Sequence, residues 1–167
     1  GLEATETELA KESMVWKFNG ERVLIVDDGR ENRDLVRLLL EEVNLNVTSA
    51  EDGPIGFDKA IQTPFDLIFM DMQMPVMDGY TATRLLRSNN VNTPIYALTA
   101  HAMKGFENSC REAGCTGHLT KPIDIDKLLD TVGRELNGKR IKSDKQASRK
   151  QPMNPAQTES RIVSTLP

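Results

Sequence analysis

The chain has 167 residues, of which 38% are hydrophobic and 28% are charged, so a globular core is expected and wholesale disorder is excluded. The net charge of −4 is uneven, because residues 138–167 contain seven basic and two acidic residues, or +5, and the rest therefore carries −9. An acidic domain with a basic tail lacks the basic face of a nucleic-acid-binding domain, so we expect no nucleic-acid partner.

Residues 1–20 are polar, with a short helical pattern around Glu6–Met14, and we expect them to form a linker or an incoming helix. Trp16 and Phe18 are expected to pack this segment onto the domain that follows. The segment lacks the apolar core of a signal peptide, and no apolar stretch of the chain approaches the length of a membrane-spanning helix. We therefore expect a cytoplasmic segment without membrane contact.

Between residues 21 and 137, short apolar runs alternate five times with helical patterns. Continuous apolar runs of this length are typical of strands buried on both faces of a parallel sheet. The expected strands are Arg22–Val26, Asn46–Ser49, Phe65–Met70, Pro94–Leu98 and Gly117–Leu119. The expected helices are Glu31–Val43, Asp52–Gln62, Thr81–Ser88, Ala102–Ala113 and Asp124–Leu136. This order predicts an α/β domain over residues 21–137, followed by a polar, largely disordered tail over residues 138–167.

The two cysteines, Cys110 and Cys115, have neither Cys-x-x-Cys spacing nor a histidine at zinc-finger spacing. If both lay on one helix, a separation of five positions would place them on different faces. We therefore expect two reduced, partly buried side chains rather than a redox pair or a metal site.

Polar residues stand just past the ends of four of the five predicted strands. Asp27 and Asp28 follow the first strand, Asp71 the third, Thr99 the fourth, and Lys121 comes shortly after the fifth. In an open parallel sheet these ends lie along one edge, so we expect the five side chains to converge in one crevice. Three carboxylates in a small volume favour a hard divalent cation such as Mg²⁺, and a carboxylate is also a competent nucleophile at phosphorus.

The segments around these residues resemble the motifs of response-regulator receiver domains in both order and spacing. The matching segments are Val26-Asp27-Asp28, Met70–Pro75, Met77-Asp78-Gly79, Leu98-Thr99-Ala100 and Thr120-Lys121-Pro122. The resemblance covers roughly residues 21–137. It implies a flavodoxin-like (βα)5 fold, a doubly wound parallel sheet with strand order 2-1-3-4-5. The polar composition of residues 1–20 and 138–167 predicts flexible tails at both ends of this domain.

The resemblance implies that Asp71 accepts a phosphoryl group from the phosphohistidine of a histidine kinase or a histidine phosphotransfer domain. It also implies that Mg²⁺ is the cofactor. The implied metal ligands are Asp27, Asp28, Asp71 and the backbone carbonyl of Gln73.

The resemblance further implies that Lys121 and Thr99 contact the phosphoryl oxygens and that the Lys121–Pro122 peptide bond is cis. Thr99 and Ala100 would then move as a switch, with Pro122 and His118 also in the switch region. His118 departs from the family pattern, because an aromatic residue that moves with the threonine usually stands there. The changed face, formed by residues 102–113 and the strand and helix that follow, would be recognised by a downstream protein that the sequence does not identify.

We interpret the chain as the C-terminal receiver of a hybrid sensor histidine kinase, with a stand-alone single-domain regulator as the alternative. As an isolated domain it is expected to be a phosphoacceptor with possible autodephosphorylation, not a classical enzyme. Two further alternatives stay open. A Mg²⁺-dependent phosphohydrolase usually has a second acid where Gln73 stands, and a flavin-binding module usually has a phosphate loop where Asp27-Asp28-Gly29 stands.

Overall fold

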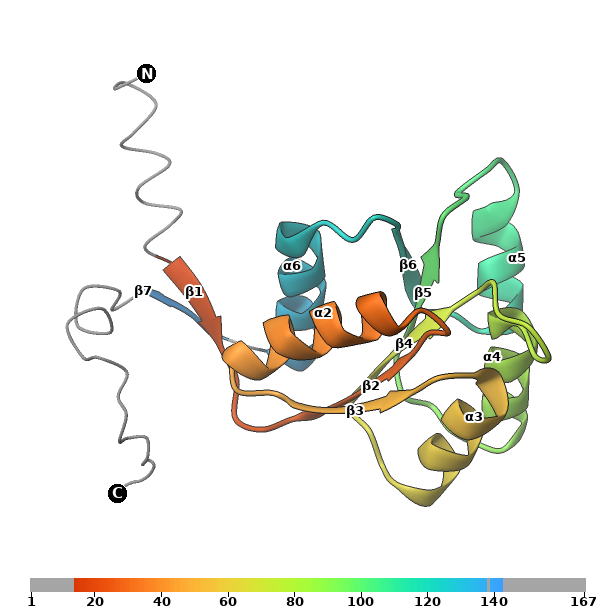
Figure 1. The fold of residues 1–167 in the computed structure, drawn as a ribbon, viewed down its shortest axis with the longest axis horizontal. Helices are drawn as coiled ribbons and strands as arrows, with labels where there is room; N and C mark the ends of the chain where they lie inside the picture. Colours follow the sequence, from red (N-terminus) through yellow and green to blue (C-terminus); the bar gives the residue numbers. More distant parts are fainter. Residues whose placement is uncertain (1–13, 138, 143–167) are drawn as a thin grey trace. The chain divides into compact units, whose positions relative to one another are not determined.

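The structure is a computed structural model that describes residues 14–137 and 139–142 (Figure 1). Most of the helical pattern predicted around Glu6–Met14, and the predicted tail beyond residue 142, lie outside the described residues. The chain divides into two compact units, and the unit that carries the five-stranded sheet and its helices spans Trp16–Lys139.

Five parallel strands form the central sheet, in the spatial order β3-β2-β4-β5-β6. Their bounds are β2 Arg22–Val26, β3 Asn46–Ala50, β4 Leu67–Asp71, β5 Ile95–Thr99 and β6 Gly117–Thr120. Because β2 is the first strand of this sheet along the chain, the observed order confirms the predicted order 2-1-3-4-5. All residues of β4 and β5 are buried, as the uninterrupted apolar runs of the sequence predicted for central strands.

Helices cover both faces of the sheet, so the fold is doubly wound (Figure 1). The helices are α2 Arg30–Glu42, α3 Gly53–Gln62, α4 Gly79–Ser88, α5 Phe106–Ala113 and α6 Ile125–Leu136. The apolar residues of α2 and α6 join the core on one face, and those of α3, α4 and α5 join the core on the other. This arrangement confirms the predicted α/β fold class.

Aspartate side chains begin three of these helices. Asp52 accepts a hydrogen bond from the Ile55 amide at 2.8 Å, and Asp78 accepts one from the Thr81 amide at 2.8 Å. Asp124 caps α6 in the same way. Such caps satisfy backbone donors that the first turn leaves without partners, and they place the helix starts within one or two residues of those predicted.

Helix α5 starts later than predicted. The expected start was Ala102, but the helix begins at Phe106 because Gly105 has a φ of 90°, a left-handed conformation that does not continue a helix. Residues 101–105 are exposed and form a loop. This loop follows β5 directly, at the edge of the sheet where the candidate site lies.

The N-terminal segment is attached to the domain by aromatic packing. Phe18 is buried in the core, and its ring stacks on that of Trp16 with centroids 6.1 Å apart, which confirms the predicted packing of both residues. Two short strands, β1 Met14–Lys17 and β7 Lys139–Lys142, form a separate two-stranded sheet. The sequence did not predict these two strands, since their pairing joins segments far apart in the sequence.

Replacing Gly133 with alanine should displace Trp16. A Cβ atom at Gly133 would lie 2.4 Å from Cη2 of Trp16, so the indole must move. We expect a net destabilisation of about 1 kcal/mol, because the helix-forming preference of alanine partly offsets the overpacking. Trp16 is the single tryptophan, so its emission should shift to longer wavelength. Asp130→Ala, at an exposed position of the same helix, is the control, and unchanged emission in Gly133→Ala would contradict the packing.

Candidate functional site

The sheet brings two predicted acidic residues together at the ends of neighbouring strands. Strands β2 and β4 are paired with Val26 opposite Met70, so Asp27 and Asp71 each stand one position beyond this pair. Both side chains are almost inaccessible to solvent, with Asp27 0% and Asp71 1% exposed, whereas Asp28 is exposed. One carboxylate oxygen from each of the three lies within 4.8 Å of the others. The predicted acidic cluster is therefore present at the predicted edge.

Lys121 reaches the same cluster from the turn after β6. Its backbone amide donates to the Thr99 carbonyl at 2.8 Å, and its Nζ lies 3.1 Å from Asp27 Oδ2 and 3.3 Å from Asp71 Oδ1. The Lys121–Pro122 peptide bond is cis. Because burying two carboxylates side by side is unfavourable, the ammonium between them provides the compensating charge.

Backbone amides orient both buried carboxylates. The Gly29 amide donates to Asp27 Oδ1 at 2.8 Å, and the Gln73 amide donates to Asp71 Oδ1 at 3.0 Å. Asp71 Oδ2 is buried and has no hydrogen-bond partner among the residues that the structure describes. A buried acceptor without a donor is costly, so this oxygen is positioned to contact a ligand. An all-oxygen set of this kind fits a hard divalent cation.

The environment of Asp71 makes its carboxylate unusually basic. The pKa of Asp71 is raised from 3.8 to about 6; burial is the largest cause, and the hydrogen bond from the Gln73 amide opposes the shift. The neighbouring Asp27 carboxylate contributes to this rise, while Lys121 acts to lower the pKa. For Lys121, burial alone would lower the pKa, but the carboxylates of Asp27 and Asp71 outweigh it and the pKa is raised. At neutral pH the cluster therefore has a protonated lysine and a mostly ionised Asp71.

Thr99 ends β5 at the same edge, but its hydroxyl points into its own loop. The hydroxyl accepts a hydrogen bond from the His101 amide at 3.0 Å and donates to the His101 carbonyl at 3.2 Å. Thr99 is 2% exposed, while Ala100, which follows it, is exposed. The hydroxyl is thus near the edge of the sheet and is already satisfied by hydrogen bonds.

His118 lies apart from the acidic cluster, in β6 opposite Ala97. Its ring packs edge-on against Phe106 at the start of α5, with centroids 5.2 Å apart, and Phe106 in turn packs against Tyr80. The structure therefore groups Asp27, Asp28, Asp71 and Lys121 in one cluster, and it places His118 outside that cluster, against Phe106 at the start of α5.

Two residues that support the cluster escaped the sequence analysis. Arg33, in the first turn of α2, donates from its guanidinium to the Asp27 carbonyl at 2.8 Å. Gly79 packs so tightly that an added Cβ would lie 2.3 Å from the Asp71 carbonyl oxygen. Gly79 belongs to a motif quoted above, but nothing in the sequence indicated which backbone atom it approaches. Their roles are visible only in the fold: Arg33 holds the backbone carbonyl of Asp27, and Gly79 lets the chain pass close to the backbone carbonyl of Asp71.

Comparison with known proteins agrees with this geometry. Residues 23–133 match the family model described as the response regulator receiver domain. The chain is 42% identical over 116 residues to the sensor protein GacS of Pseudomonas syringae pv. syringae, covering 66% of this chain and 13% of GacS. It is 39% identical over 123 residues to the histidine-protein kinase BarA of Escherichia coli K12, covering 72% of this chain and 13% of BarA.

Solved structures show the same fold. The receiver domain of sensor histidine kinase PA1611 from Pseudomonas aeruginosa PAO1, described with a magnesium ion coordinated in its active-site cleft, has a TM-score of 0.65 and 34% identity, covering 71% of this chain and 98% of that one. The receiver domain of Saccharomyces cerevisiae Ssk1, solved with the histidine phosphotransfer protein Ypd1, has a TM-score of 0.68 and 25% identity, covering 72% of this chain and 91% of that one.

The chain therefore belongs to the response regulator receiver domain family, whose members act in two-component signal transduction. It spans about an eighth of the length of GacS and BarA, each of which it covers to 13%. None of the described helices combines the length and hydropathy that crossing a membrane requires.

Proposed function

We propose that Asp71 accepts a phosphoryl group from a phosphohistidine, in a reaction that requires Mg²⁺. One observation carries the proposal: the buried Asp71 carboxylate is held through Oδ1 by the Gln73 amide and Lys121, while Oδ2 makes no hydrogen bond to any described residue. An oriented carboxylate with one available oxygen is suited to attack phosphorus. The pKa of Asp71, about 6, leaves it mostly ionised at neutral pH and more basic than an ordinary aspartate.

The remaining residues would control charge around the transferred group. Asp27, Asp28, Asp71 and the Gln73 carbonyl are the proposed metal ligands, and the three carboxylates are already grouped. Bound Mg²⁺ would supply positive charge that offsets the charge of the carboxylates and the phosphoryl oxygens. The Lys121 ammonium, which is paired with both Asp27 and Asp71, would contact a phosphoryl oxygen and stabilise the negative charge that develops on it.

The same proposal includes a switch at the end of β5. The Thr99 hydroxyl would leave the His101 backbone and bind a phosphoryl oxygen, carrying Ala100 and the exposed 101–105 loop with it. The start of α5 would move with this loop, because Phe106 is the first residue of the helix and its ring contacts His118 in β6. Pro122, which follows Lys121, would belong to the same switch region. The altered face formed by α5, β6 and α6 would then bind a downstream protein.

The proposed donor is a histidine kinase or a histidine phosphotransfer domain. Support comes from the similarity to sensor kinases and from the complex of the Ssk1 receiver with a phosphotransfer protein. We propose that residues 21–137 form the receiver module of a hybrid sensor histidine kinase, on its cytoplasmic side, and that a stand-alone regulator is the alternative. The isolated domain would serve as a phosphoacceptor with autodephosphorylation, while kinase activity would belong to the parent chain.

Intact mass spectrometry tests phosphoryl acceptance directly. Incubation with Mg²⁺ and acetyl phosphate should give a single phosphoryl adduct, and chelation of the metal should prevent it. Asp71→Asn should abolish the adduct, because the amide cannot attack phosphorus, whereas Asp58→Asn at an exposed site of α3 should keep it. An adduct that persists in Asp71→Asn would refute the assignment. Multiple turnover of organophosphates would favour a phosphohydrolase instead, and a yellow purified protein would favour a flavin module.

A further inference from the structure

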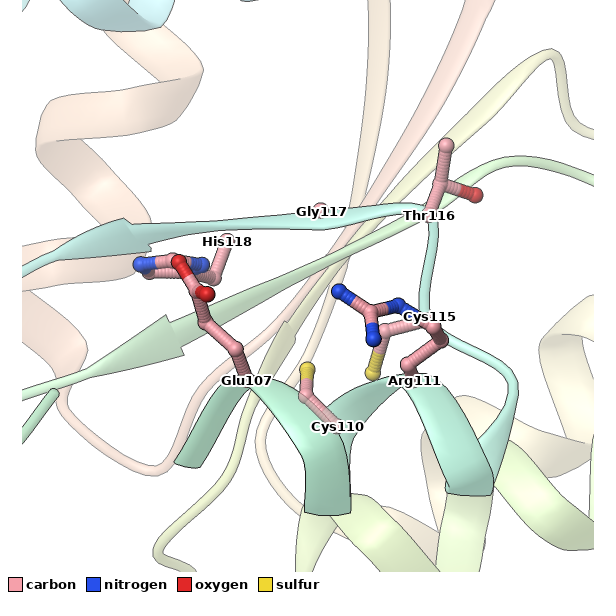
Figure 2. Close-up of a pocket in the computed structure, with 7 residues that line it drawn as sticks. All are labelled: Glu107, Cys110, Arg111, Cys115, Thr116, Gly117 and His118. Atoms are coloured by element: carbon pink, nitrogen blue, oxygen red, sulfur yellow. The ribbon is translucent and has the colours of Figure 1, made fainter. Parts of the chain in front are cut away.

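Two thiols face each other at the C-terminal end of α5, outside the acidic cluster that would accept the phosphoryl group. The Cys115 amide donates to the Cys110 carbonyl at 3.0 Å, and the Gly114 amide donates to the Arg111 carbonyl at 2.9 Å, with Gly114 at a φ of 110°. This is a Schellman motif, which brings the residue after the glycine against a residue in the last helical turn. Apolar side chains usually make that contact, and here two cysteines do (Figure 2).

The expectation for the cysteines is thereby corrected in part. Both are free thiols, with Cys110 buried and Cys115 half-buried, as predicted. However, the helix ends at Ala113, so the rule for positions on one helix does not apply to Cys115. The turn at Gly114 folds Cys115 back toward Cys110, so the two side chains approach each other instead of lying on different faces.

The surroundings of Cys115 favour its thiolate. The Cys110 thiol donates a hydrogen bond to it, which is the largest cause of its lowered pKa, and burial opposes this shift. The Thr83 hydroxyl is fully buried and has no well-formed hydrogen bond within the described part of the chain, yet it lies close enough to Cys115 to lower this pKa as well. The charge of Arg87 acts in the same direction, and its guanidinium donates twice to the Gly114 carbonyl, at 3.0 and 2.8 Å.

The two cysteines have unequal roles because their environments differ. The pKa of the Cys110 thiol is raised, first by its hydrogen bond to Cys115 and then by burial, so Cys110 keeps its proton. A cavity of about 230 Å³ is lined by both cysteines, and Glu107, Arg111 and His118 are among the other residues that line it (Figure 2). Since a water molecule occupies roughly 30 Å³ in the liquid, a small hydroperoxide can enter this space.

We propose that Cys110 and Cys115 form a peroxide-sensitive dithiol, in which Cys115 reacts with hydrogen peroxide and Cys110 then closes a disulfide. The Cys115 thiolate attacks one peroxide oxygen, the O–O bond breaks, and the products are a sulfenic acid and hydroxide, which takes up a proton to become water. The Cys110 sulfur then attacks the Cys115 sulfur, the S–O bond breaks, and a second water leaves with the Cys110 proton. The two sulfurs together lose two electrons, and the peroxide is reduced to water.

Peptide mapping of the full chain tests the proposal. The reduced protein is treated with hydrogen peroxide, alkylated, and digested with trypsin without reductant. Trypsin cleaves after Arg111, so a disulfide would join two separate peptides, and dithiothreitol should release them. The intact protein should lose two hydrogen atoms. Oxidation confined to exposed methionines such as Met103, or a disulfide found only between two chains, would overturn the proposal.

Variants then assign the roles. In Cys110→Ser the reaction should stop at a sulfenic acid on residue 115 that dimedone traps, and Cys115→Ser should not be labelled at residue 110. Thr83→Val should slow disulfide formation about two- to tenfold, because it removes the hydroxyl that lowers the pKa of Cys115, while Thr83→Ser should restore the rate. Equal rates in Thr83→Val and the wild type would overturn the role of Cys115. The wild-type mapping decides the disulfide itself even if a variant folds poorly.

Discussion

Lys121→Met is expected to reduce the rate of phosphoryl uptake from acetyl phosphate by about a hundredfold or more. The ammonium lies 3.1 Å from Asp27 Oδ2 and 3.3 Å from Asp71 Oδ1, and it is the cation placed to contact a phosphoryl oxygen in the proposed reaction. Its loss also removes the attraction that lowers the pKa of Asp71. At neutral pH a larger share of Asp71 would then be protonated, and a protonated carboxyl group is a poor nucleophile.

The rate is measured by intact mass against time, with saturating Mg²⁺ and acetyl phosphate. Lys104→Met, in the exposed loop before α5, is the matched control and should react like the wild type. Circular dichroism should confirm that Lys121→Met is folded, because removing the lysine leaves two buried carboxylates without a compensating charge. A folded Lys121→Met protein that takes up phosphate at the wild-type rate would exclude the proposed role of this lysine.

Asp71→Asn is expected to stabilise the metal-free protein by about 1–3 kcal/mol at pH 7.5, where the lower figure allows for solvent screening. The folded protein raises the pKa of Asp71 from 3.8 to about 6, so folding disfavours the ionised carboxylate. Below pH 3.8 the group is protonated in both the folded and the unfolded chain, and it imposes no cost. Between pH 3.8 and about 6 the unfolded chain ionises Asp71 while the folded chain keeps it protonated, so the free energy of unfolding falls as the pH rises. Above about pH 6 the folded protein also buries the charge beside Asp27, and the cost is at its full size.

The free energy of unfolding should therefore differ between the variant and the wild type above pH 6, and the difference should vanish near pH 4. Urea denaturation in the presence of a chelator, repeated across this range, measures it. Asp58→Asn, on the exposed side of α3, should show no such pH-dependent gain. A stabilisation by Asp71→Asn that is as large at pH 4 as at pH 7.5 would show that charge burial is not its cause.

The sequence predicted most of the candidate site because the positions of the site residues follow from the alternation of strands and helices. Asp27, Asp71, Thr99 and Lys121 each come just after or at the end of an apolar run, and in a parallel sheet such ends share one edge. The ion pairs of Lys121 and the buried Asp71 carboxylate agree with that expectation. The start of α5 was placed too early, since an apolar pattern does not report the left-handed backbone at Gly105.

By itself, the sequence determined the α/β class, the five strand–helix units and the residues that stand at the strand ends. Those features depend on local periodicity and on rules of chain connection, which are visible along the chain. Only the tertiary structure decided that Asp71 Oδ2 has no hydrogen-bond partner in the described region, that the Thr99 hydroxyl faces its own loop, and that Cys110 meets Cys115 beside the Thr83 hydroxyl. These contacts join different elements or follow one turn's backbone geometry, and no spacing in the sequence encodes the direction in which a side chain points after a turn.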